Sequence, residues 1–196
     1  MRLRIVHFAA GLAAAFAGAV SPARAFDVPD PCSWSLIRSN CEGAKSAWDS
    51  DGYDVYVTGH VHHGRSTYSP EKIKTLNERA WGGGVGKRYT DADDDTHLLY
   101  ALAFKDSHFK PEYMVGYGWL TYWHPFDGGP RLGAGFTGFV TLRSDYSHYL
   151  GPVPGILPLG EIAWGRASLM ATYVPRLSGN GGNGDVLMIF GRVSFP

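Results

Sequence analysis

Three histidines, His60, His62 and His63, form the densest group of potentially reactive side chains in the sequence. On a β-strand His60 and His62 would share one face, whereas His63 would point to the other. Two histidines at that spacing can contribute to a metal site, but the sequence offers no evident third ligand, and we predict no metal. The aspartates within 91–95 could bind calcium, yet a solvated turn is the favoured interpretation.

A second candidate is the pair Asp106-Ser107, which directly follows an apolar stretch. Taken alone, such a pair is typical of a turn at the end of a strand. The chain has no Gly-x-Ser-x-Gly nucleophile motif, no P-loop and no Cys-x-x-Cys. The local sequence therefore identifies residues that can exchange protons, but it does not identify the reaction that they serve.

The elements that must position these residues are β-strands, because hydrophobicity alternates with period two after residue 51. We expect eight strands, at roughly 52–66, 79–90, 96–105, 113–124, 131–143, 153–164, 167–175 and 185–195. The connections after the first, third, fifth and seventh strands are longer or richer in functional residue types, as in outer-membrane barrels. An even number of strands permits a closed antiparallel barrel without exposed edges.

Composition supports a membrane β-barrel and argues against other classes of protein. The 196 residues include 18 basic and 18 acidic side chains, so a nucleic-acid partner is not expected. The mean hydropathy of −0.15 is too polar for a bundle of membrane helices. Only 18% of the residues are charged and 14% are aromatic, which fits an all-β protein with a lipid-facing surface.

The segment 98–104 distinguishes a membrane barrel from a soluble barrel of the lipocalin type. A soluble barrel would have one apolar face, directed inward. Here one face carries Leu99, Ala101 and Ala103, and the other carries Leu98, Tyr100, Leu102 and Phe104. Both faces are apolar, which favours lipid outside the barrel and an apolar ligand inside it.

The first 25 residues have the pattern of a secretory signal peptide. A basic start is followed by the short apolar stretch 8–20 and by the small-x-small cleavage site Ala23-Arg24-Ala25. We therefore expect cleavage after Ala25, an N-terminal segment with an amphipathic helix at 26–50, and the barrel at 51–196.

The N-terminal helix is expected over 33–48. Bulky or small apolar side chains recur there at helical spacing, at Trp34, Ile37, Cys41, Ala44 and Trp48. Tryptophans near both ends suit a membrane interface, although packing on a soluble core fits equally well. Cys32 and Cys41 would be about 13 Å apart within one helix, farther than the roughly 7 Å that a disulfide tolerates. Either the helix starts after Cys32 and the chain folds back, or both thiols are free.

Five motifs of the chain match one known family. The most specific are Asn77-Glu-Arg-Ala-Trp-Gly-Gly-Gly-Val-Gly86 and Tyr100-Ala-Leu-Ala-Phe-Lys-Asp-Ser107. The others are Gly116-Tyr-Gly-Trp119, Leu132-Gly-Ala-Gly-Phe-Thr137 and Thr172-Tyr-Val-Pro175. Together they resemble the lipid A palmitoyltransferase family, PagP, in order and over roughly 50–195.

The resemblance implies an eight-stranded transmembrane β-barrel in the outer membrane of a Gram-negative cell, with an N-terminal amphipathic helix. It also implies an acyltransferase, active at the cell surface without a cofactor, that moves a palmitoyl chain from a glycerophospholipid to lipid A. The expected partners are these two lipids, other outer-membrane lipids and the barrel assembly machinery, and the protein is expected to be a monomer. The alternatives are a non-enzymatic barrel of the OmpX type or an adhesin, and an outer-membrane lipid A deacylase.

The resemblance further implies a catalytic histidine, aspartate and serine. Asp106 and Ser107 match the Asp-Ser pair, and the spacing from Tyr53-Asp-Val-Tyr56 gives His63 as the histidine, with His62 as the neighbouring competitor. Acyl transfer to a hydroxyl needs a base and a group that stabilises the oxyanion. His63 is the natural base. Asp106 could orient it or act with it, and Ser107 could be a nucleophile or a donor to the carbonyl oxygen.

Two glycines of the fourth strand are expected to shape the acyl-binding site. Bulky side chains on the opposite parity suit the lipid interface, so Gly116 and Gly118 should face the lumen and leave an apolar slot. By resemblance, Gly118 is the position that limits acyl-chain length, and a glycine there should admit a full palmitoyl chain.

Two prolines are expected to open a lateral route for lipid. Pro158 and Pro175 fall within the sixth and seventh expected strands, where a proline removes a ladder donor. In the family such prolines give an acyl chain lateral access to the barrel. A second proline pair of the family, on the first two strands, is replaced here by Thr58 and Ala80, a departure that concerns the route expected for lipid A.

Overall fold

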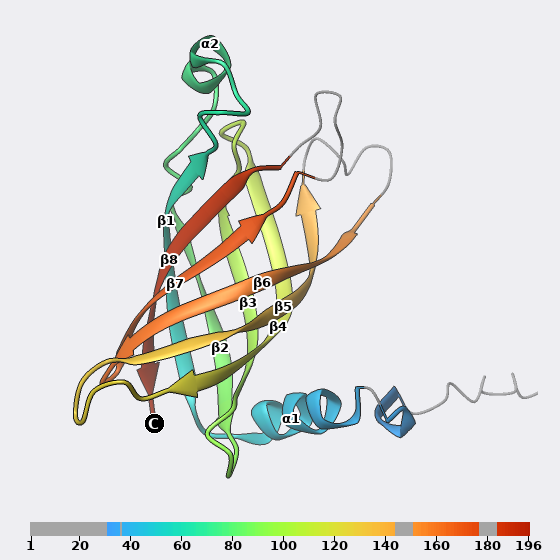
Figure 1. Ribbon diagram of the computed structural model, residues 1–196. Helices are drawn as coiled ribbons and strands as arrows, with labels where there is room; N and C mark the ends of the chain where they lie inside the picture. Colours follow the sequence, from blue (N-terminus) through green and yellow to red (C-terminus); the bar gives the residue numbers. More distant parts are fainter. Residues whose placement is uncertain (1–30, 36, 144–150, 177–183) are drawn as a thin grey trace, which may run out of the picture. The chain divides into compact units, whose positions relative to one another are not determined.

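The computed structural model describes residues 31–35, 37–143, 151–176 and 184–196. Its eight strands form a closed antiparallel barrel in which each strand pairs with the next and β8 pairs with β1 (Figure 1). The strands are β1 Tyr53–His63, β2 Gly82–Thr90, β3 Thr96–Lys105, β4 Pro111–Trp123, β5 Arg131–Arg143, β6 Val153–Trp164, β7 Ala167–Val174 and β8 Val186–Phe195. The predicted eight-stranded barrel is confirmed, and the predicted signal peptide lies outside the described residues.

The outer face of the barrel is apolar and is bordered by aromatic side chains. Valines at the middle of several strands are exposed, among them Val55, Val57, Val85, Val115 and Val140. One end of the barrel carries exposed Tyr53, Tyr89, Trp123, Trp164 and Phe195, and the other carries Trp81, Tyr113 and Tyr173. An apolar band between two aromatic girdles is typical of transmembrane barrels.

The N-terminal helix begins later than the sequence predicted. A short 3-10 turn, η1 Pro31–Ser33, precedes α1 Arg38–Asp49. The chain folds back before α1, so that Cys32 and Cys41 form a disulfide with their Cα atoms 5.3 Å apart. This settles the two alternatives left open by the sequence in favour of a later helix start. No helix of the described residues is long and apolar enough to cross a membrane.

Helix α1 is held against β3 and β4 by close contacts. Gly43 lies directly against the ring of His97, where a Cβ atom would be only 2.1 Å from Nδ1. The same ring nitrogen is 2.7 Å from the Tyr117 hydroxyl, which donates to Asn40 Oδ1 at 3.0 Å. Gly43, which weakens the helix by propensity, is thus what allows the helix to approach the barrel.

The lumen has an apolar part and a polar part. The apolar part contains Tyr56, Val61, Ala80, Leu98, Leu102, Phe104, Leu120, Leu159 and Met170. In the polar part, the buried guanidinium of Arg192 lies 3.0 Å from Asp54 Oδ2 and 2.5 Å from Glu161 Oε1. Asp54 is near the start of β1 and His63 is at its end, so this ion-pair group and His63 lie at opposite ends of the barrel.

Candidate active site

The last residues of β1 direct one histidine inward and two outward. The pairing of β1 with β8 is irregular between Thr58 and His60, and β1 resumes its alternation after this point. The rings of His60 and His62 lie on the same side, 6.4 Å apart, whereas His63 is 1% exposed. The predicted division of the three histidines between two faces is confirmed, and His63 rather than His62 faces the interior.

His63 meets Ser107, although the two residues are far apart in the sequence. Its Nε2 atom lies 3.1 Å from the Ser107 hydroxyl, in the connection between β3 and β4. Asn77 holds this connection in place: its N–H donates to the Ser107 carbonyl at 2.8 Å, and its side-chain amide donates to the Asp106 carbonyl at 3.0 Å. Two of the three residues expected at the site are therefore in direct contact.

Asp106 lies beside Ser107, and its carboxylate is directed in part at its own turn. One oxygen of its carboxylate, Oδ1, accepts the backbone N–H groups of His108 and Lys110, both at 2.8 Å. The other, Oδ2, is buried and has no hydrogen-bond partner among the described residues. An orienting contact with His63, one of the two roles left open for Asp106, is absent among the described residues, and Asp106 shapes the turn that presents Ser107.

The carboxylate that does contact His63 belongs to Glu78. Its Oε1 atom lies 3.4 Å from His63 Nδ1 and accepts the backbone N–H of His63 at 3.2 Å. Arg65 binds the same carboxylate with both terminal nitrogens, at 2.7 and 2.8 Å. This hydrogen-bonded guanidinium holds the pKa of the Glu78 carboxyl at about 2, so Glu78 is an anion at neutral pH.

Sequence reasoning did not give Glu78 a role, although a signal was present. Glu78 lies in the Asn77–Gly86 motif, and Arg65 stands two positions after His63. What the sequence lacks is the turn of chain that brings these segments together. Helix α2 Pro70–Lys74 lies in the connection between them, and Leu76 to Trp81 then runs back beside the end of β1, where the N–H of Val61 donates to the Glu78 carbonyl at 3.0 Å.

A second loop contact covers His63 from above the strand end. The ring of Tyr68 lies edge-on to the His63 ring, with 5.4 Å between centroids. The Tyr68 hydroxyl donates to the Gly184 carbonyl at 2.7 Å, and Thr67 donates to the Asp185 carboxylate. The loop after β1 is thereby tied to the start of β8, which limits the freedom of the His63 ring.

The two glycines expected to shape the acyl site differ in their surroundings. A Cβ atom on Gly118 would lie 3.3 Å from Leu159 and 3.5 Å from Leu98, both buried in the apolar lumen. A Cβ atom on Gly116 would lie 2.4 Å from the hydroxyl of Tyr100. Both glycines face inward as predicted, but the space at Gly116 is filled by Tyr100, and the open slot expected there is not what the structure shows.

The pairing between β6 and β7 is incomplete where Pro158 stands. Among the described residues this ladder ends at the pair Leu159 and Thr172, although β6 continues to Val153. Pro158 is the next residue of β6, and its carbonyl accepts the Thr172 hydroxyl at 2.8 Å. Pro175 lies one residue beyond the end of β7, so the expectation that it interrupts the strand is wrong.

The ladder between β1 and β2 is also incomplete, and we call each of these two incompletely paired boundaries a seam. The β1–β2 ladder ends at Thr58 and Gly82, while β1 continues to His63 with its other edge still paired with β8. The Thr58 hydroxyl donates to the Ala80 carbonyl at 2.5 Å and so bridges the seam at the two positions that depart from the family pattern. A hollow of about 460 Å³ lies beside the bridge, lined in part by Trp81 and Leu169.

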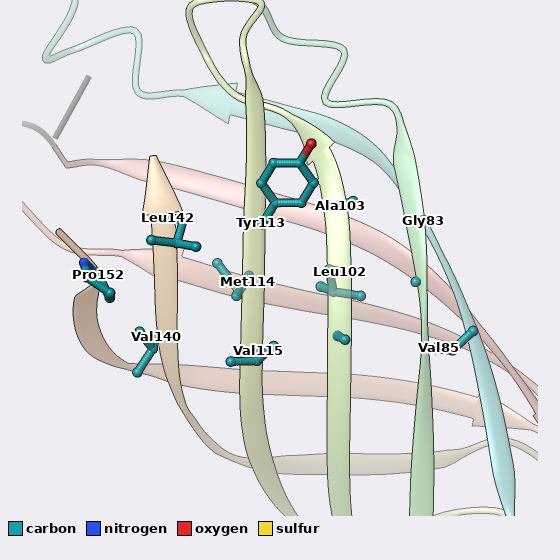
Figure 2. A pocket seen from close by; sticks show the side chains of 12 residues that line it. Gly83, Val85, Leu102, Ala103, Tyr113, Met114, Val115, Val140, Leu142 and Pro152 are labelled. Atoms are coloured by element: carbon teal, nitrogen blue, oxygen red, sulfur yellow. The ribbon is translucent and has the colours of Figure 1, made fainter. Parts of the chain in front are cut away.

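A separate groove of about 420 Å³ lies on the outer face of β2 to β5 (Figure 2). Its small residues are Gly83, Ala101 and Ala103, and exposed Tyr113 and Val115 stand beside them. None of its lining residues belongs to the expected catalytic set.

In one of the two groups of possible metal ligands, an aspartate makes local hydrogen bonds to the backbone. In the run 91–95, Asp91 Oδ1 accepts the backbone N–H groups of Asp93 and Asp95, which closes a turn. No group of three or more histidine, cysteine, aspartate or glutamate side chains among the described residues is arranged to hold a metal ion.

Comparison with known proteins assigns the chain to a family. The profile of the family described as "Antimicrobial peptide resistance and lipid A acylation protein PagP" matches residues 44–192. A protein of Bordetella parapertussis named lipid A acyltransferase PagP is 44% identical over 174 residues, which are 89% of this chain and 92% of the relative. A protein of Legionella pneumophila with the same name is 42% identical over 166 residues, 84% of this chain and 86% of the relative. The chain therefore belongs to the PagP family.

Proposed function

We propose that the protein is an outer-membrane lipid A acyltransferase that moves a palmitoyl chain from a glycerophospholipid to lipid A. The observation that carries this proposal is the 3.1 Å contact between His63 Nε2 and the Ser107 hydroxyl, at one end of a barrel with an apolar outer face. The relatives in Bordetella and Legionella are named lipid A acyltransferases. A base beside a hydroxyl is what transfer of an acyl group between oxygens requires.

In this proposal His63, Asp106 and Ser107 are the catalytic residues. His63 acts as the general base through Nε2 and later returns the proton to the leaving oxygen. Asp106 presents Ser107 through its two backbone hydrogen bonds, and its buried Oδ2 is free to accept a substrate hydroxyl. Ser107 serves either as the nucleophile or as the donor that stabilises the carbonyl oxygen. Mass measurement of the intact protein after incubation with donor lipid alone separates these roles, because only a nucleophile gains an acyl group.

The lumen and the β6–β7 seam are the proposed path of the donor lipid. The acyl chain passes between β6 and β7 beside Pro158 and Pro175, and extends toward Gly118 among Leu98 and Leu159. Support comes from the early end of the β6–β7 ladder and from the apolar character of these neighbours. Lipid A approaches from the opposite seam, where the Thr58 bridge must open or be bypassed.

The His63 end of the barrel is proposed to face the cell surface, and the protein is proposed to act as a monomer inserted by the barrel assembly machinery. The short connections between strands, at the end opposite His63, support this orientation, because outer-membrane barrels have short turns on the periplasmic side. A closed barrel leaves no free strand edge for a second copy, which supports the monomer.

The decisive experiment is mass spectrometry of lipid A from cells with and without the gene. Gain of one palmitoyl group supports the proposed transfer. Loss of an acyl chain would identify a lipid A deacylase, and unchanged lipid A under membrane stress would indicate a structural barrel or an adhesin.

Substitutions at the site refine the same experiment. His63→Ala and Ser107→Ala should abolish transfer, because each removes one side of the 3.1 Å contact. His62→Ala is the matched control, since its side chain points outward beside His60. Loss of activity in His62→Ala with full activity in His63→Ala would contradict the assignment. Heat-modifiable migration on gels verifies that each variant is folded.

A further inference from the structure

We propose that Glu78 is a positioning residue for acyl transfer: its carboxylate, held by Arg65, accepts a hydrogen bond from the Nδ1–H group of His63 and thereby directs the Nε2 lone pair at Ser107. The inference rests on the proposed function and adds to it a residue outside the catalytic set. It also replaces Asp106 as the group that orients the histidine.

The first argument is that contacts other than the one with the His63 ring already hold the Glu78 carboxylate in place. Arg65 binds both carboxylate oxygens, at 2.7 and 2.8 Å, in the fork geometry that gives a guanidinium–carboxylate pair its directional strength. The backbone N–H of His63 adds a third donor to Oε1 at 3.2 Å. Three donors on one carboxylate leave it little freedom to turn away from His63.

The second argument concerns the tautomer of His63. An ionised carboxylate can only accept hydrogen bonds, so a neutral ring with Nδ1 at 3.4 Å from Glu78 must carry its proton on Nδ1. The remaining nitrogen, Nε2, then has a free lone pair and accepts from the Ser107 hydroxyl at 3.1 Å. The 3.4 Å distance is long, as is common for catalytic contacts without substrate.

The third argument is that the other neighbours of the His63 ring do not accept a hydrogen bond from its Nδ1 atom. Tyr68 contacts His63 edge-on through its ring, and its hydroxyl is engaged by the Gly184 carbonyl. Asp106 directs one oxygen at its own turn. Among the described residues, Glu78 is the acceptor that lies within hydrogen-bond distance of His63 Nδ1.

The test compares three variants in detergent micelles that contain a palmitoyl glycerophospholipid and lipid A. Glu78→Ala removes the acceptor and its charge, Glu78→Gln keeps an acceptor without the charge, and Glu78→Asp keeps both on a shorter stem. Glu71→Gln is the matched control, because Glu71 is an exposed acid on the neighbouring helix α2. Gel mobility verifies folding, and ¹⁵N NMR of the His63 ring reports its tautomer independently of activity.

The expected result is a loss of about 10²-fold in kcat for Glu78→Ala with little change in KM, since acid–base positioning acts on the chemical step. Glu78→Gln should lose less, Glu78→Asp should recover part of the activity, and Glu71→Gln should match the wild type. The wild-type ring should carry its proton on Nδ1, and Glu78→Ala should shift it toward Nε2.

Two outcomes would overturn the proposal. One is a wild-type ring protonated on Nε2, and the other is a folded Glu78→Ala protein with wild-type kcat. If the wild type itself transfers no acyl group, the proposed function fails, whereas the NMR measurement still decides whether Glu78 sets the tautomer. If Glu78→Ala does not fold, Glu78→Gln and Glu78→Asp carry the comparison.

Discussion

At the scale of single residues, Arg65 controls the charge of the carboxylate beside the proposed base. Its hydrogen bonds are the main reason why the pKa of Glu78 falls from 4.5 to about 2. Because the folded value lies below the ordinary one, the resulting stabilisation is present above pH 4.5 and is lost as the pH falls through about 2. Near neutral pH, Glu78 therefore stays ionised and adds no acid limb of its own to the activity profile.

We predict that Arg65→Met raises the pKa of Glu78 toward its ordinary value, because the substitution removes the guanidinium and keeps a stem of similar size. The measurement is an NMR titration of the Glu78 side-chain carboxyl in detergent micelles. Arg166→Met, at the exposed turn between β6 and β7, is the control and should leave the titration unchanged. A Glu78 titration that is the same in Arg65→Met and wild type would contradict this account.

A second residue-scale prediction concerns Gly118, whose Cβ position is bounded by Leu98 and Leu159. Gly118→Met should fill the end of the acyl path and shift donor preference to chains several carbons shorter. Each methylene that can no longer be buried costs about 0.8 kcal/mol, so the discrimination should be sharp. A donor series of defined chain lengths measures it.

Gly138→Met is the matched control for this series. Gly138 is also a strand glycine, it pairs with Tyr117 across β4 and β5, and a Cβ atom there would meet nothing within 4 Å. The Gly138→Met protein should therefore have the same donor preference as the wild type. An unchanged preference in a folded, active Gly118→Met protein would show that the acyl path ends elsewhere.

The residues of the site mark the limit of what sequence could predict. His63 and Ser107 were found because each belongs to a recognisable motif, and strand alternation alone placed His63 on the opposite face from His62. The contact between Glu78 and His63 was not predicted, because it depends on the chain returning to the end of β1 after α2. For Asp106 two roles were left open, orienting His63 or acting with it, because adjacency to Ser107 in sequence says nothing about where its carboxylate points.

At the scale of elements, the strands were predictable and the helix start was not. Alternation with period two continues along each strand, so β3, β5 and β6 were predicted with their observed bounds. The start of α1 at Arg38 depends instead on a covalent link between Cys32 and Cys41, which overrides helical spacing in the residues before it. Pro175 was placed inside a strand because the alternation continues to it, whereas β7 ends one residue earlier.

The β6–β7 seam gives a prediction at this scale. Pro158→Ala restores a backbone N–H immediately beyond the last pair, Leu159 and Thr172, and should extend the ladder. We expect slower transfer from phospholipid donors with little loss of fold, measured as initial rate in micelles. Pro154→Ala is the control, because Pro154 lies four residues farther along β6. Equal slowing by both substitutions would mean that the ladder end is not the point of lipid access.

At the scale of the whole molecule, the buried charges of Arg192, Asp54 and Glu161 join β8, β1 and β6 across the lumen. Tyr122 adds a hydrogen bond from β4 to Glu161 at 2.8 Å. The alternation of apolar and polar residues along the strands did not predict this ion-pair network. Alternation indicates which side chains face inward, but not which of them contact one another. The network thereby links β4 and β6, which are not neighbours in the sheet, to the paired strands β1 and β8.

We predict that Arg192→Ala lowers the free energy of unfolding by about 3–5 kcal/mol, because it leaves the buried carboxylate of Glu161 without its cation and that of Asp54 with Arg88 alone. Denaturant unfolding of the refolded protein in detergent measures the loss. Combining Arg192→Ala with Glu161→Gln should recover part of it, since the charge that lost its cation is then removed. Arg166→Ala, at an exposed position, should stay close to the wild type.

The pairing of β8 with β1 also sets an order of events during assembly. These two strands come from opposite ends of the barrel sequence, so their contacts are the least local in the fold and bear the largest loop-closure entropy. His63 has Val186 of β8 as its register partner, and Gly64 donates to the Asp185 carbonyl just before that strand. The proposed base thus reaches its final position only when the last strand docks, and an unclosed barrel cannot yet act on the lipids around it.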